Sequence, residues 1–345
     1  MNVAPPSLQQ GLRILHTPHN IAGGATIFAE EMRALNTETD ALCYASKGIF
    51  RTDLQLPTNA SHWEKLRTLI WAAAKYDVFI FWYGQSLLGE SLLEVPLLKR
   101  LGKTVVFYFV GCDIRNEREV TRSSKVSACE ACFPKLCSRN RDLARETAER
   151  YADIVYVSTP DLMGSITNAK LLLQPFNRLS SVPSSPPRTP NSRFRIAHAP
   201  SSRQIKGTSY LLKAVQHLRD EGHDVELDLI ENVSNDAALL RYAQADLAVD
   251  QLLIGTYGTF AVECMALGIP VLCYLDERYI DKYPAKPPII SSSPLEITDR
   301  LREVITGQFD LIALSQQATK YVSEFHSGRR LAEQVLADLL KHRPR

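Results

Sequence analysis

A single carboxylate interrupts an apolar stretch in the last third of the chain. The stretch IGTYGTFAVECMALGIPVLCYL occupies residues 254–275, and Glu263 is its one charged side chain. A carboxylate accepts hydrogen bonds from two hydroxyls at once, and a ribose offers two vicinal hydroxyls. The loop from Gly255 to Gly258 lets a phosphate approach the backbone closely. These residue types favour a nucleotide diphosphate site, and the alternative is a glutamate on the exposed face of a helix.

The apolar spacing of this stretch predicts a short helix over residues 259–267. Its buried stripe, at positions i, i+4 and i+7, consists of Phe260, Cys264 and Leu267. Glu263 lies off that stripe, one turn inside the helix, and Gly268 is placed to end it.

A second stretch combines two cations with a predicted helix start. In RIAHAPSSRQIKGTSYLLKAVQHL, residues 195–218, an apolar strand is followed by Arg203 and Lys206, and Gly207 opens a helix. The N–H groups at a helix start carry partial positive charge and, with two cations beside them, bind anions. The alternative is a solvated surface loop whose cations face water.

Short apolar runs alternate with helix-period segments along the chain, which predicts parallel sheets covered on both faces. The alternation stops in SSVPSSPPRTPNS, because proline removes hydrogen-bond donors and fixes φ. We therefore expect an α/β protein with two Rossmann-like, doubly wound domains, over 1–176 and 195–345, joined by a Ser/Pro-rich linker over 177–194. The last helix is expected to pack back on the first domain. Ligands bind at the carboxyl ends of such strands, where Asp250 and Gln251 stand.

Composition narrows the class of partner. The 345 residues carry a formal net charge of +2, and Lys and Arg are spread along the chain, which gives no reason to expect a nucleic-acid partner. No apolar run reaches the roughly 20 residues of a membrane span. The amino terminus lacks the basic start and apolar run of a signal peptide, so we expect a cytoplasmic protein. Its slight positive charge allows weak attraction to an anionic membrane surface.

Together these pieces resemble the GT-B-fold glycosyltransferases, especially the retaining glycosyltransferase family four. In that family a loop of the type EGFG-L precedes a helix of the type EAMA-G-PV, and here GTYGT (255–259) is followed by ECMA (263–266) and GIPV (268–271). HAPSSRQIKGT (198–208) is similar to the family's Arg/Lys diphosphate loop, with a shorter Arg-to-Lys spacing. HNIAGGATIFAEEM (19–32) resembles the Gly-Gly loop of the acceptor domain.

The resemblance implies a GT-B architecture, with two domains facing across a cleft. It gives Glu263 the donor ribose hydroxyls, and Lys206 with Arg203 the donor diphosphate. It also implies donor contacts around the two glycine loops, from Gly24, Asp250, Tyr257, Gly258 and Thr259. Cations and helix dipoles would stabilise the leaving diphosphate, so no metal or other cofactor is required for catalysis.

The chain departs from the family pattern at one position of the donor site. The family's earlier glutamate, eight residues before Glu263, is associated with the transferred sugar, and Gly255 stands in its place. Asp250 and Gln251 are candidates to supply a substitute carboxylate or amide.

The first domain carries the second departure. After the strand TVVFYFVG (104–111) the family often has a histidine-containing loop, whereas this chain has Asp113 and Arg115. We expect Asp113 to position or deprotonate the acceptor hydroxyl. The alternative is a structural pair of Asp113 and Arg115 that fixes the loop. His19, just before the Gly-Gly loop, is a further candidate, and its alternative is a structural loop histidine.

CEACFPKLC, residues 129–137, raises a separate question. Cys129 and Cys132 have the spacing of a zinc knuckle, Cys137 follows five residues later, and Cys112 is a candidate fourth thiolate. The spacing predicts a closed structural zinc site. The alternative is a set of buried or idle thiols. A disulfide framework is not expected in a cytoplasmic protein.

The sequence thus predicts a glycosyltransferase that moves a sugar from a nucleotide diphosphate sugar, of the UDP type, to an acceptor hydroxyl with retention. The expected acceptor is a saccharide or lipid-linked saccharide of polysaccharide or glycoconjugate synthesis, reached at the inner face of the cell membrane. The alternative is a catalytically silent GT-B protein that binds nucleotide sugars or supports a partner enzyme, which Gly255 keeps open. A nicotinamide oxidoreductase is disfavoured, because no strand is followed by a GxGxxG turn.

Overall fold

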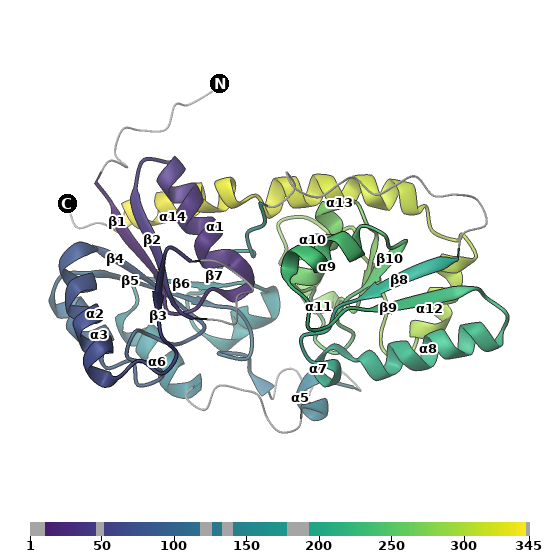
Figure 1. Cartoon of the computed structure of the whole chain (residues 1–345), viewed down its shortest axis with the longest axis horizontal. Coiled ribbons are helices and arrows are strands. Elements are labelled where there is room, and N and C mark those ends of the chain that lie inside the picture. Colours follow the sequence, from purple (N-terminus) through teal and green to yellow (C-terminus); the bar gives the residue numbers. More distant parts are fainter. Residues whose placement is uncertain (1–10, 46–51, 118–125, 133–140, 178–192, 343–345) are drawn as a thin grey trace. The chain divides into compact units, whose positions relative to one another are not determined.

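Seven parallel strands form the sheet of the first folding unit (Figure 1). The computed structural model describes residues 11–45, 52–117, 126–132, 141–177 and 193–342. These divide into two compact units. Unit 1 holds the described residues of 11–115, 141–177 and 327–342, and unit 2 holds those of 116–132 and 193–326.

The sheet of unit 1 has the strand order β3-β2-β1-β4-β5-β6-β7. Its strands are β1 (Arg13–Thr17), β2 (Glu38–Tyr44), β3 (Leu54–Leu56), β4 (Val78–Trp82), β5 (Thr104–Phe109), β6 (Ile154–Val157) and β7 (Lys170–Leu171). Every residue of the central strand β4 is buried. A strand covered on both faces reads as a continuous apolar run, which is why VFIFW was recognisable in the sequence.

Helices cover both faces of this sheet, so unit 1 is doubly wound. One face packs against α1 (Gly24–Ala34) and α14 (Gly328–Lys341), and the other against α2 (His62–Lys75), α3 (Glu94–Arg100) and α6 (Arg141–Tyr151). The short 3-10 helices η2 (Ile21–Gly23) and η3 (Pro160–Ser165) follow β1 and β6 at their carboxyl ends.

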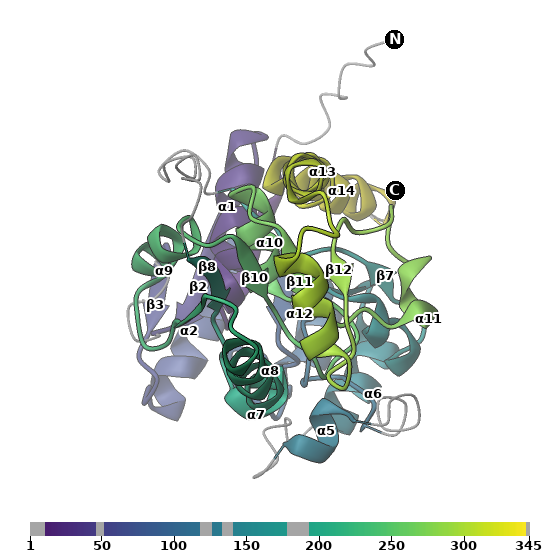
Figure 2. The same ribbon diagram turned by 90° about the vertical axis from the view of Figure 1, so that its right-hand side faces the viewer.

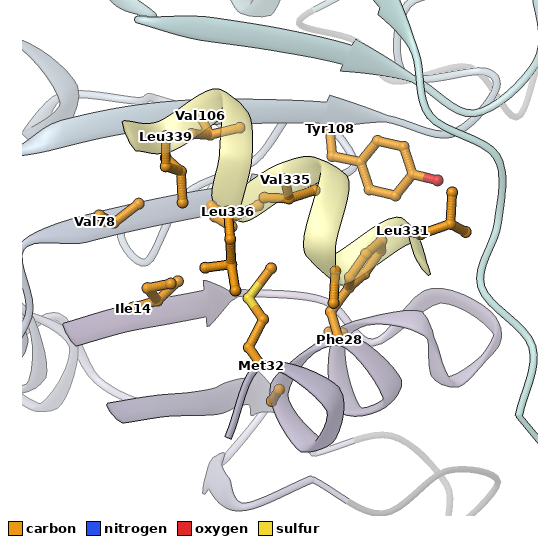
Figure 3. Packing of buried hydrophobic residues seen from close by; sticks show 14 of the residues in the cluster. Ile14, Phe28, Met32, Val78, Val106, Tyr108, Leu331, Val335, Leu336 and Leu339 are labelled. Carbon is orange, nitrogen blue, oxygen red and sulfur yellow. The ribbon is translucent and has the colours of Figure 1, made fainter. Parts of the chain in front are cut away.

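The last helix of the described chain, α14, belongs to unit 1 (Figure 3). Its apolar face carries Leu331, Val335, Leu336 and Leu339, which pack with Phe28 and other residues of α1 and of the sheet. Burying each of these side chains contributes about 1.5–3 kcal/mol. The helix is therefore part of the core of unit 1, although it follows unit 2 in the sequence.

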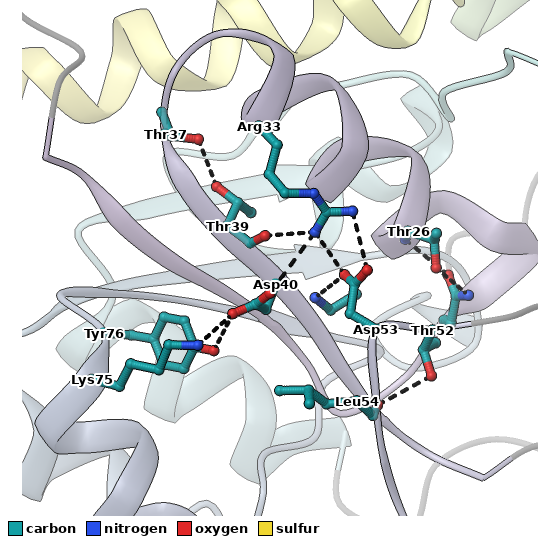
Figure 4. A network of polar contacts seen from close by, with 12 residues as sticks. Thr26, Arg33, Thr37, Thr39, Asp40, Thr52, Asp53, Leu54, Lys75 and Tyr76 are labelled. Carbon is teal, nitrogen blue, oxygen red and sulfur yellow. Dashed lines mark hydrogen bonds and ion pairs between the residues drawn. The ribbon is translucent and has the colours of Figure 1, made fainter.

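A polar network ties the edge of this sheet to α1 and α2 (Figure 4). Arg33 of α1 donates to Asp53 at 2.9 Å and to the carbonyl of Thr39 at 2.7 Å. Asp40 of β2 accepts from the Lys75 ammonium of α2 at 2.8 Å and from the Tyr76 hydroxyl. Each partly buried charge thus has an opposite charge beside it.

Unit 2 contains a parallel sheet of five strands in the order β12-β11-β10-β8-β9. Its strands are β8 (Phe194–His198), β9 (Val225–Leu229), β10 (Leu247–Val249), β11 (Val271–Cys273) and β12 (Ile290–Ser291). Its helices are α5 (Ala128–Ala131), α7 (Arg203–Lys206), α8 (Thr208–Asp220), α9 (Asn235–Tyr242), α10 (Thr259–Ala266), α11 (Glu277–Ile280), α12 (Ile297–Ile305) and α13 (Leu311–Phe325). Helices α8 and α12 lie side by side on one face, and α10 and α13 lie on the other (Figure 2).

The predicted α/β class with two parallel, doubly wound sheets is confirmed. Most of the predicted linker lies outside the described residues; Asn177, at its start, accepts from the N–H of Gly328 within unit 1 at 3.0 Å. The predicted domain ranges were continuous, whereas the compact units are not. Residues 116–117 and 126–132 belong to unit 2, and residues 327–342, which hold the last helix, belong to unit 1. Within the described ranges, no helix combines the length and apolarity that crossing a membrane requires.

Candidate functional site

The carboxyl ends of β8, β10 and β11 gather polar side chains in unit 2. These strands are parallel neighbours, so they end at the same edge of the sheet. His198 is the last residue of β8, and Asp250 and Gln251 follow β10 directly. Two of the three, His198 and Asp250, are about 1% exposed. Buried polar groups at this edge need partners, and those partners define the site.

Lys206 supplies the central partner. Its ammonium lies 3.2 Å from Oδ1 of Asp250 and 2.6 Å from Oε1 of Gln251. The other oxygen of Asp250 accepts from the N–H of Gly258 at 2.6 Å. One carboxylate therefore ties the cation of α7 to the glycine loop before α10. The Lys206 side chain is 13% exposed, so the surface-loop alternative is wrong for this residue.

Gly258 is required by the space around it. A Cβ at this position would lie 2.9 Å from the Lys206 ammonium and 3.2 Å from Oδ2 of Asp250. Its φ of −106° is accessible to any residue, so conformational freedom is not the reason for glycine here. The absent side chain leaves the ammonium directly beside the backbone where α10 begins. Lys206 therefore lies beside the backbone at the start of α10, whereas the sequence analysis placed the predicted anion site at the helix start after Gly207.

Gly255 is held in a conformation that excludes the family's glutamate. Its φ is +82°, in the left-handed region, and a Cβ would lie 2.9 Å from Cβ of Asp276. The N–H of Asp276 donates to the Gly255 carbonyl at 2.9 Å, which fixes this close approach. A glutamate here would be strained and would clash. The departure from the family pattern is therefore built into the loop and into the segment after β11.

Glu263 is buried, with 7% of its surface exposed. The amide of Asn235, the first residue of α9, donates to its Oε1 at 2.8 Å. The exposed-glutamate alternative is therefore wrong. The predicted buried stripe was too narrow: all residues of α10 from Phe260 to Ala266 are buried, whereas Leu267 is partly exposed. Sequence reasoning missed Asn235, which precedes Glu263 by 28 residues and lies in a different helix.

The remaining donor-site candidates of unit 2 differ in placement. Arg203 is 56% exposed and donates to Glu231, after β9, at 2.9 Å. Thr259 is the first residue of α10 and is partly exposed. The Tyr257 ring is buried, stacks on Tyr283 and bonds through its hydroxyl to His326 at 2.9 Å. The buried ring of Tyr257 is therefore not accessible to a ligand.

His198 is a residue of this edge that the sequence analysis did not single out. Its Nδ1 lies 2.6 Å from the Val249 carbonyl, and its Nε2 lies 2.8 Å from the Thr208 hydroxyl. Because a carbonyl only accepts, Nδ1 carries the proton and Nε2 accepts from Thr208. Burial lowers the pKa of His198, which keeps the ring neutral. The histidine joins β8 and β10 to the first residue of α8. Its position at the end of a predicted strand is the sequence feature that could have identified it.

In unit 1, Asp113 is fully buried in the loop after β5. It accepts from the N–H of Gly111 at 2.6 Å and from that of Val110 at 3.1 Å. Arg115 donates to Asp161 at 2.8 Å, so its ion-pair partner is not Asp113, as the structural alternative had it. Burial raises the pKa of Asp113 to about 6, although the backbone N–H groups lower it. Contact with an acceptor hydroxyl would require this loop to open.

The raised pKa predicts how stability changes with pH. Between about pH 4 and 6 native Asp113 holds a proton that the unfolded chain has lost, so its contribution to stability falls as pH rises through this window. Asp113→Asn stays neutral and keeps an acceptor oxygen. The unfolding free energy of the variant relative to wild type should increase by about 2–3 kcal/mol between pH 4 and 7 in urea titrations. Parallel pH profiles would contradict the burial argument.

Two other candidates of unit 1 follow β1. His19 lies 2.8 Å from Oε1 of Gln85, and its ring contacts Tyr44 and Tyr83. These contacts match the structural alternative stated for it. Gly24, the first residue of α1, is buried, and a Cβ there would lie 2.8 Å from the Trp82 ring. The Gly-Gly loop therefore brings the start of α1 against the sheet.

The cysteine cluster is described in part. Cys129 lies in α5, Cys132 follows it directly, and Cys137 lies outside the described residues. Cys112 belongs to unit 1, where it lies 3.5 Å from an Arg115 nitrogen. Among the described residues, no three of His, Cys, Asp and Glu form a group that could hold a metal ion. The six described cysteines are all thiols.

The zinc hypothesis can be tested by measuring the metal content of the purified protein. If Cys129, Cys132 and Cys137 bind zinc, protein purified without added metal should contain about one zinc per chain by elemental analysis. Cys132→Ser should lose the metal and melt at a lower temperature, because metal binding adds to folding free energy. Cys43→Ser is the control, since Cys43 is a buried thiol of unit 1. Metal-free wild-type protein would leave all these cysteines as thiols.

Comparison with known proteins identifies the fold. No protein-family model matches the chain, and no curated protein matches it. Solved structures match over nearly the whole chain. Anabaena HepE, in complex with UDP and glucose, has a TM-score of 0.64 at 12% identity and covers 96% of this chain and 100% of its own. The lipopolysaccharide outer core galactosyltransferase WaaB has a TM-score of 0.58 at 11% identity and covers 96% of this chain and 99% of its own.

This chain has the GT-B fold. A putative UDP-N-acetylglucosamine 2-epimerase from Listeria monocytogenes is similar too, with a TM-score of 0.59 at 12% identity and 96% of each chain covered. A transferase and an epimerase therefore share the fold. At such low identities the likeness fixes the fold alone, and the reaction has to be argued from the residues of this GT-B chain.

Proposed function

We propose that this GT-B protein transfers a sugar from a UDP-sugar to an acceptor hydroxyl. The observation that carries the proposal is the position of Lys206, which Asp250 and Gln251 hold beside the Gly258 backbone at the start of α10. A diphosphate needs a cation and N–H donors, and it finds both here. As the bond to the sugar breaks, negative charge grows on the leaving UDP. A fixed ammonium at this place stabilises that charge.

The two cations of the site already have carboxylate partners, so a bound donor must replace some of these interactions. Lys206 is paired with Asp250, and Arg203 is paired with Glu231. The Asp250 pair is buried at the strand end, whereas the Arg203 pair lies at the surface. We propose that Arg203 leaves Glu231 to close over the diphosphate, while Lys206 stays in place and exchanges its bond to Gln251 for a phosphate oxygen. Glu263 accepts from the ribose hydroxyls at the opposite end of the donor.

The competing ion pair makes a prediction about affinity. Glu231→Gln removes the charge that holds Arg203, so UDP should bind about two- to fivefold more tightly in calorimetric titrations. The gain should vanish when Arg203 is also changed to Ala. Glu226→Gln is the matched control, since Glu226 of β9 pairs with Arg195 of the neighbouring strand β8 at 3.3 Å. Equal gains from both glutamine variants would indicate a general effect of net charge.

The acceptor side of the proposal rests on unit 1. We propose a saccharide or lipid-linked saccharide acceptor in polysaccharide or glycoconjugate synthesis, at the cytoplasmic face of a membrane. Asp113 is proposed to act when the loop after β5 opens, with its raised pKa suiting proton transfer near neutral pH. Retention of anomeric configuration is proposed from the family resemblance. No step of the reaction needs a cofactor.

The test is release of UDP from a panel of UDP-sugars, with and without saccharide acceptors, with the anomer of the product assigned by NMR. Acceptor-dependent release is the expected result. A second candidate is a silent protein that binds UDP-sugars without turnover, which the crowding of Gly255 by Asp276 favours. Tight UDP binding without release from any donor would support the silent protein, and conversion of the free UDP-sugar would support an epimerase.

A further inference from the structure

Exposed large apolar side chains are distributed unevenly between the two units. Among the described residues of unit 2, five such side chains lie on five different segments: Leu212, Val233, Leu240, Leu295 and Ile312. Unit 1 has eight in its described part, all within or at the ends of α2, α3 and α6: Trp63, Leu66, Ile70, Trp71, Leu93, Leu97, Leu101 and Leu143. Single exposed apolar residues need no explanation, but a gathering of them on one helical layer does.

Helix α2 cannot turn this apolar face inward. Its amino end is fixed by a capping box, in which Ser61 accepts from the N–H of Glu64 and the Glu64 carboxylate accepts from that of Ser61. Its inner face is fixed by Leu69, which is buried in the core of unit 1. Trp63 and Ile70 consequently point outward and are 75% and 62% exposed. A groove of about 680 Å³ beside α2, lined in part by Ile70, extends the apolar surface to strands β2 and β3.

Helix α3 presents a second apolar stripe on the same face of the sheet. Leu93, Leu97 and Leu101 follow one another at i, i+4 and i+8, so they lie on one side of the helix. The opposite side carries Val95 and Leu98, which are buried in the core that also receives α2. Both helices therefore have one apolar side packed on the sheet and a second apolar side exposed to solvent.

Cations stand among these apolar side chains. Lys75 and Lys99 are held by Asp40 and Asp153. Lys65 lies on the side of α2 that carries the buried Leu69, with its ammonium 5.3 Å from the centre of the Tyr44 ring. Arg67 and Arg100 are exposed and have no ion pair within the described part of the chain. The acidic residues of the two helices are Glu64 and Glu94; Glu64 caps α2, and Glu94 is buried. The outward face of α2 and α3 therefore combines tryptophan and leucine with excess positive charge.

We propose that the outer face of α2 and α3 docks unit 1 onto an anionic lipid bilayer. Tryptophan and leucine enter the region between headgroups and acyl chains, and Lys or Arg beside them attract anionic headgroups. A second copy of the chain is a poorer occupant. A twofold interface would place this face against itself, and like charges would then oppose each other. The inference rests on the proposed function only in that the function already places the acceptor at a membrane.

The test is co-sedimentation of the full chain with phosphatidylcholine vesicles, with and without phosphatidylglycerol, in the absence of donor and acceptor. Binding should require the anionic lipid and weaken with salt. Trp63→Ser with Ile70→Ser should lower the partition coefficient at least about tenfold. Arg67→Gln with Arg100→Gln should lower it about fivefold per cation on anionic vesicles. The matched control is Leu212→Ser with Ile312→Ser in unit 2, which should bind as wild type does.

Three results would overturn the inference. They are absence of vesicle binding, equal binding to neutral and anionic vesicles, and an equal loss in the Leu212/Ile312 control. Light scattering tests whether a second copy of the chain occupies this face. If wild type is a dimer in solution and the Trp63→Ser, Ile70→Ser variant is a monomer, the face is a dimer interface. The thermal shift with UDP, measured on the same variants, should match wild type. If the variants lose vesicle binding but still bind UDP, the result bears on the docking face alone. If wild-type protein fails to bind UDP, the result bears on the proposed function alone.

Discussion

Lys206→Ala is expected to lower kcat/KM about thirty- to a thousandfold, which corresponds to about 2–4 kcal/mol of lost transition-state stabilisation. The ammonium lies beside the glycine backbone, is 13% exposed and has fixed partners, so it is ready for the charge that develops on the leaving diphosphate. A group that acts on developing charge changes turnover as well as affinity. Steady-state kinetics with a competent UDP-sugar would show both.

The same substitution should also destabilise the fold. Asp250 is 1% exposed, and removing Lys206 leaves its carboxylate with the N–H of Gly258 as its closest remaining donor. Breaking a buried pair by removing one partner costs about 3 kcal/mol in the free energy of unfolding. A loss of activity alone would therefore be ambiguous, because a fraction of the variant could be unfolded.

A double variant separates the two effects. In Lys206→Ala with Asp250→Asn the buried carboxylate is gone, so most of the lost stability should return, while turnover should stay low. Asp250→Asn alone keeps the cation and should retain more activity than the double variant. If the double variant recovered both stability and turnover, Lys206 would be a structural partner of Asp250 and not a catalytic group.

The parts of the fold that the sequence predicts are those with dense local patterns. β4 and β5 are apolar at nearly every position because both of their faces are covered, and that pattern is visible in isolation. β3 has three residues and β12 has two, which is too short for any period to appear. The amphipathic pattern of α14 shows a helix with a buried face, and the expectation that it packs on the first domain does not follow from that pattern. The choice of sheet is made by tertiary packing, and it assigns α14 to unit 1.

The candidate site likewise contains residues that the sequence identifies and partners that it does not. The family resemblance assigned Lys206, Asp250 and Gly258 to one donor site, and the structure places these three residues in contact. Partners from unrelated segments were not foreseeable. Tyr257 meets His326, 69 residues later, and Arg115 pairs with Asp161, 46 residues later. No periodicity connects such residues, so the buried ring of Tyr257 and the true partner of Arg115 emerge only from the fold.

Glu263→Gln is expected to weaken UDP binding at least tenfold. The buried carboxylate would accept from both ribose hydroxyls, and hydrogen bonds to charged groups contribute about 1.5–3 kcal/mol each. Glutamine keeps the shape but offers one acceptor oxygen in place of two. Calorimetry with UDP and its 2′-deoxy analogue gives the sharper measure. Wild type should prefer the ribonucleotide clearly, and the variant should discriminate less.

Asn235 provides the control for this interpretation. Its amide donates to one oxygen of Glu263, so Asn235→Ala should loosen the carboxylate without removing its charge. The expected result is a smaller loss of UDP affinity than in Glu263→Gln, with preference for the ribonucleotide retained. If wild type bound UDP and 2′,3′-dideoxy-UDP equally, the carboxylate would not contact the ribose. The buried pair of Glu263 and Asn235 would then serve to join α9 to α10, and the donor would have to be recognised through the diphosphate alone.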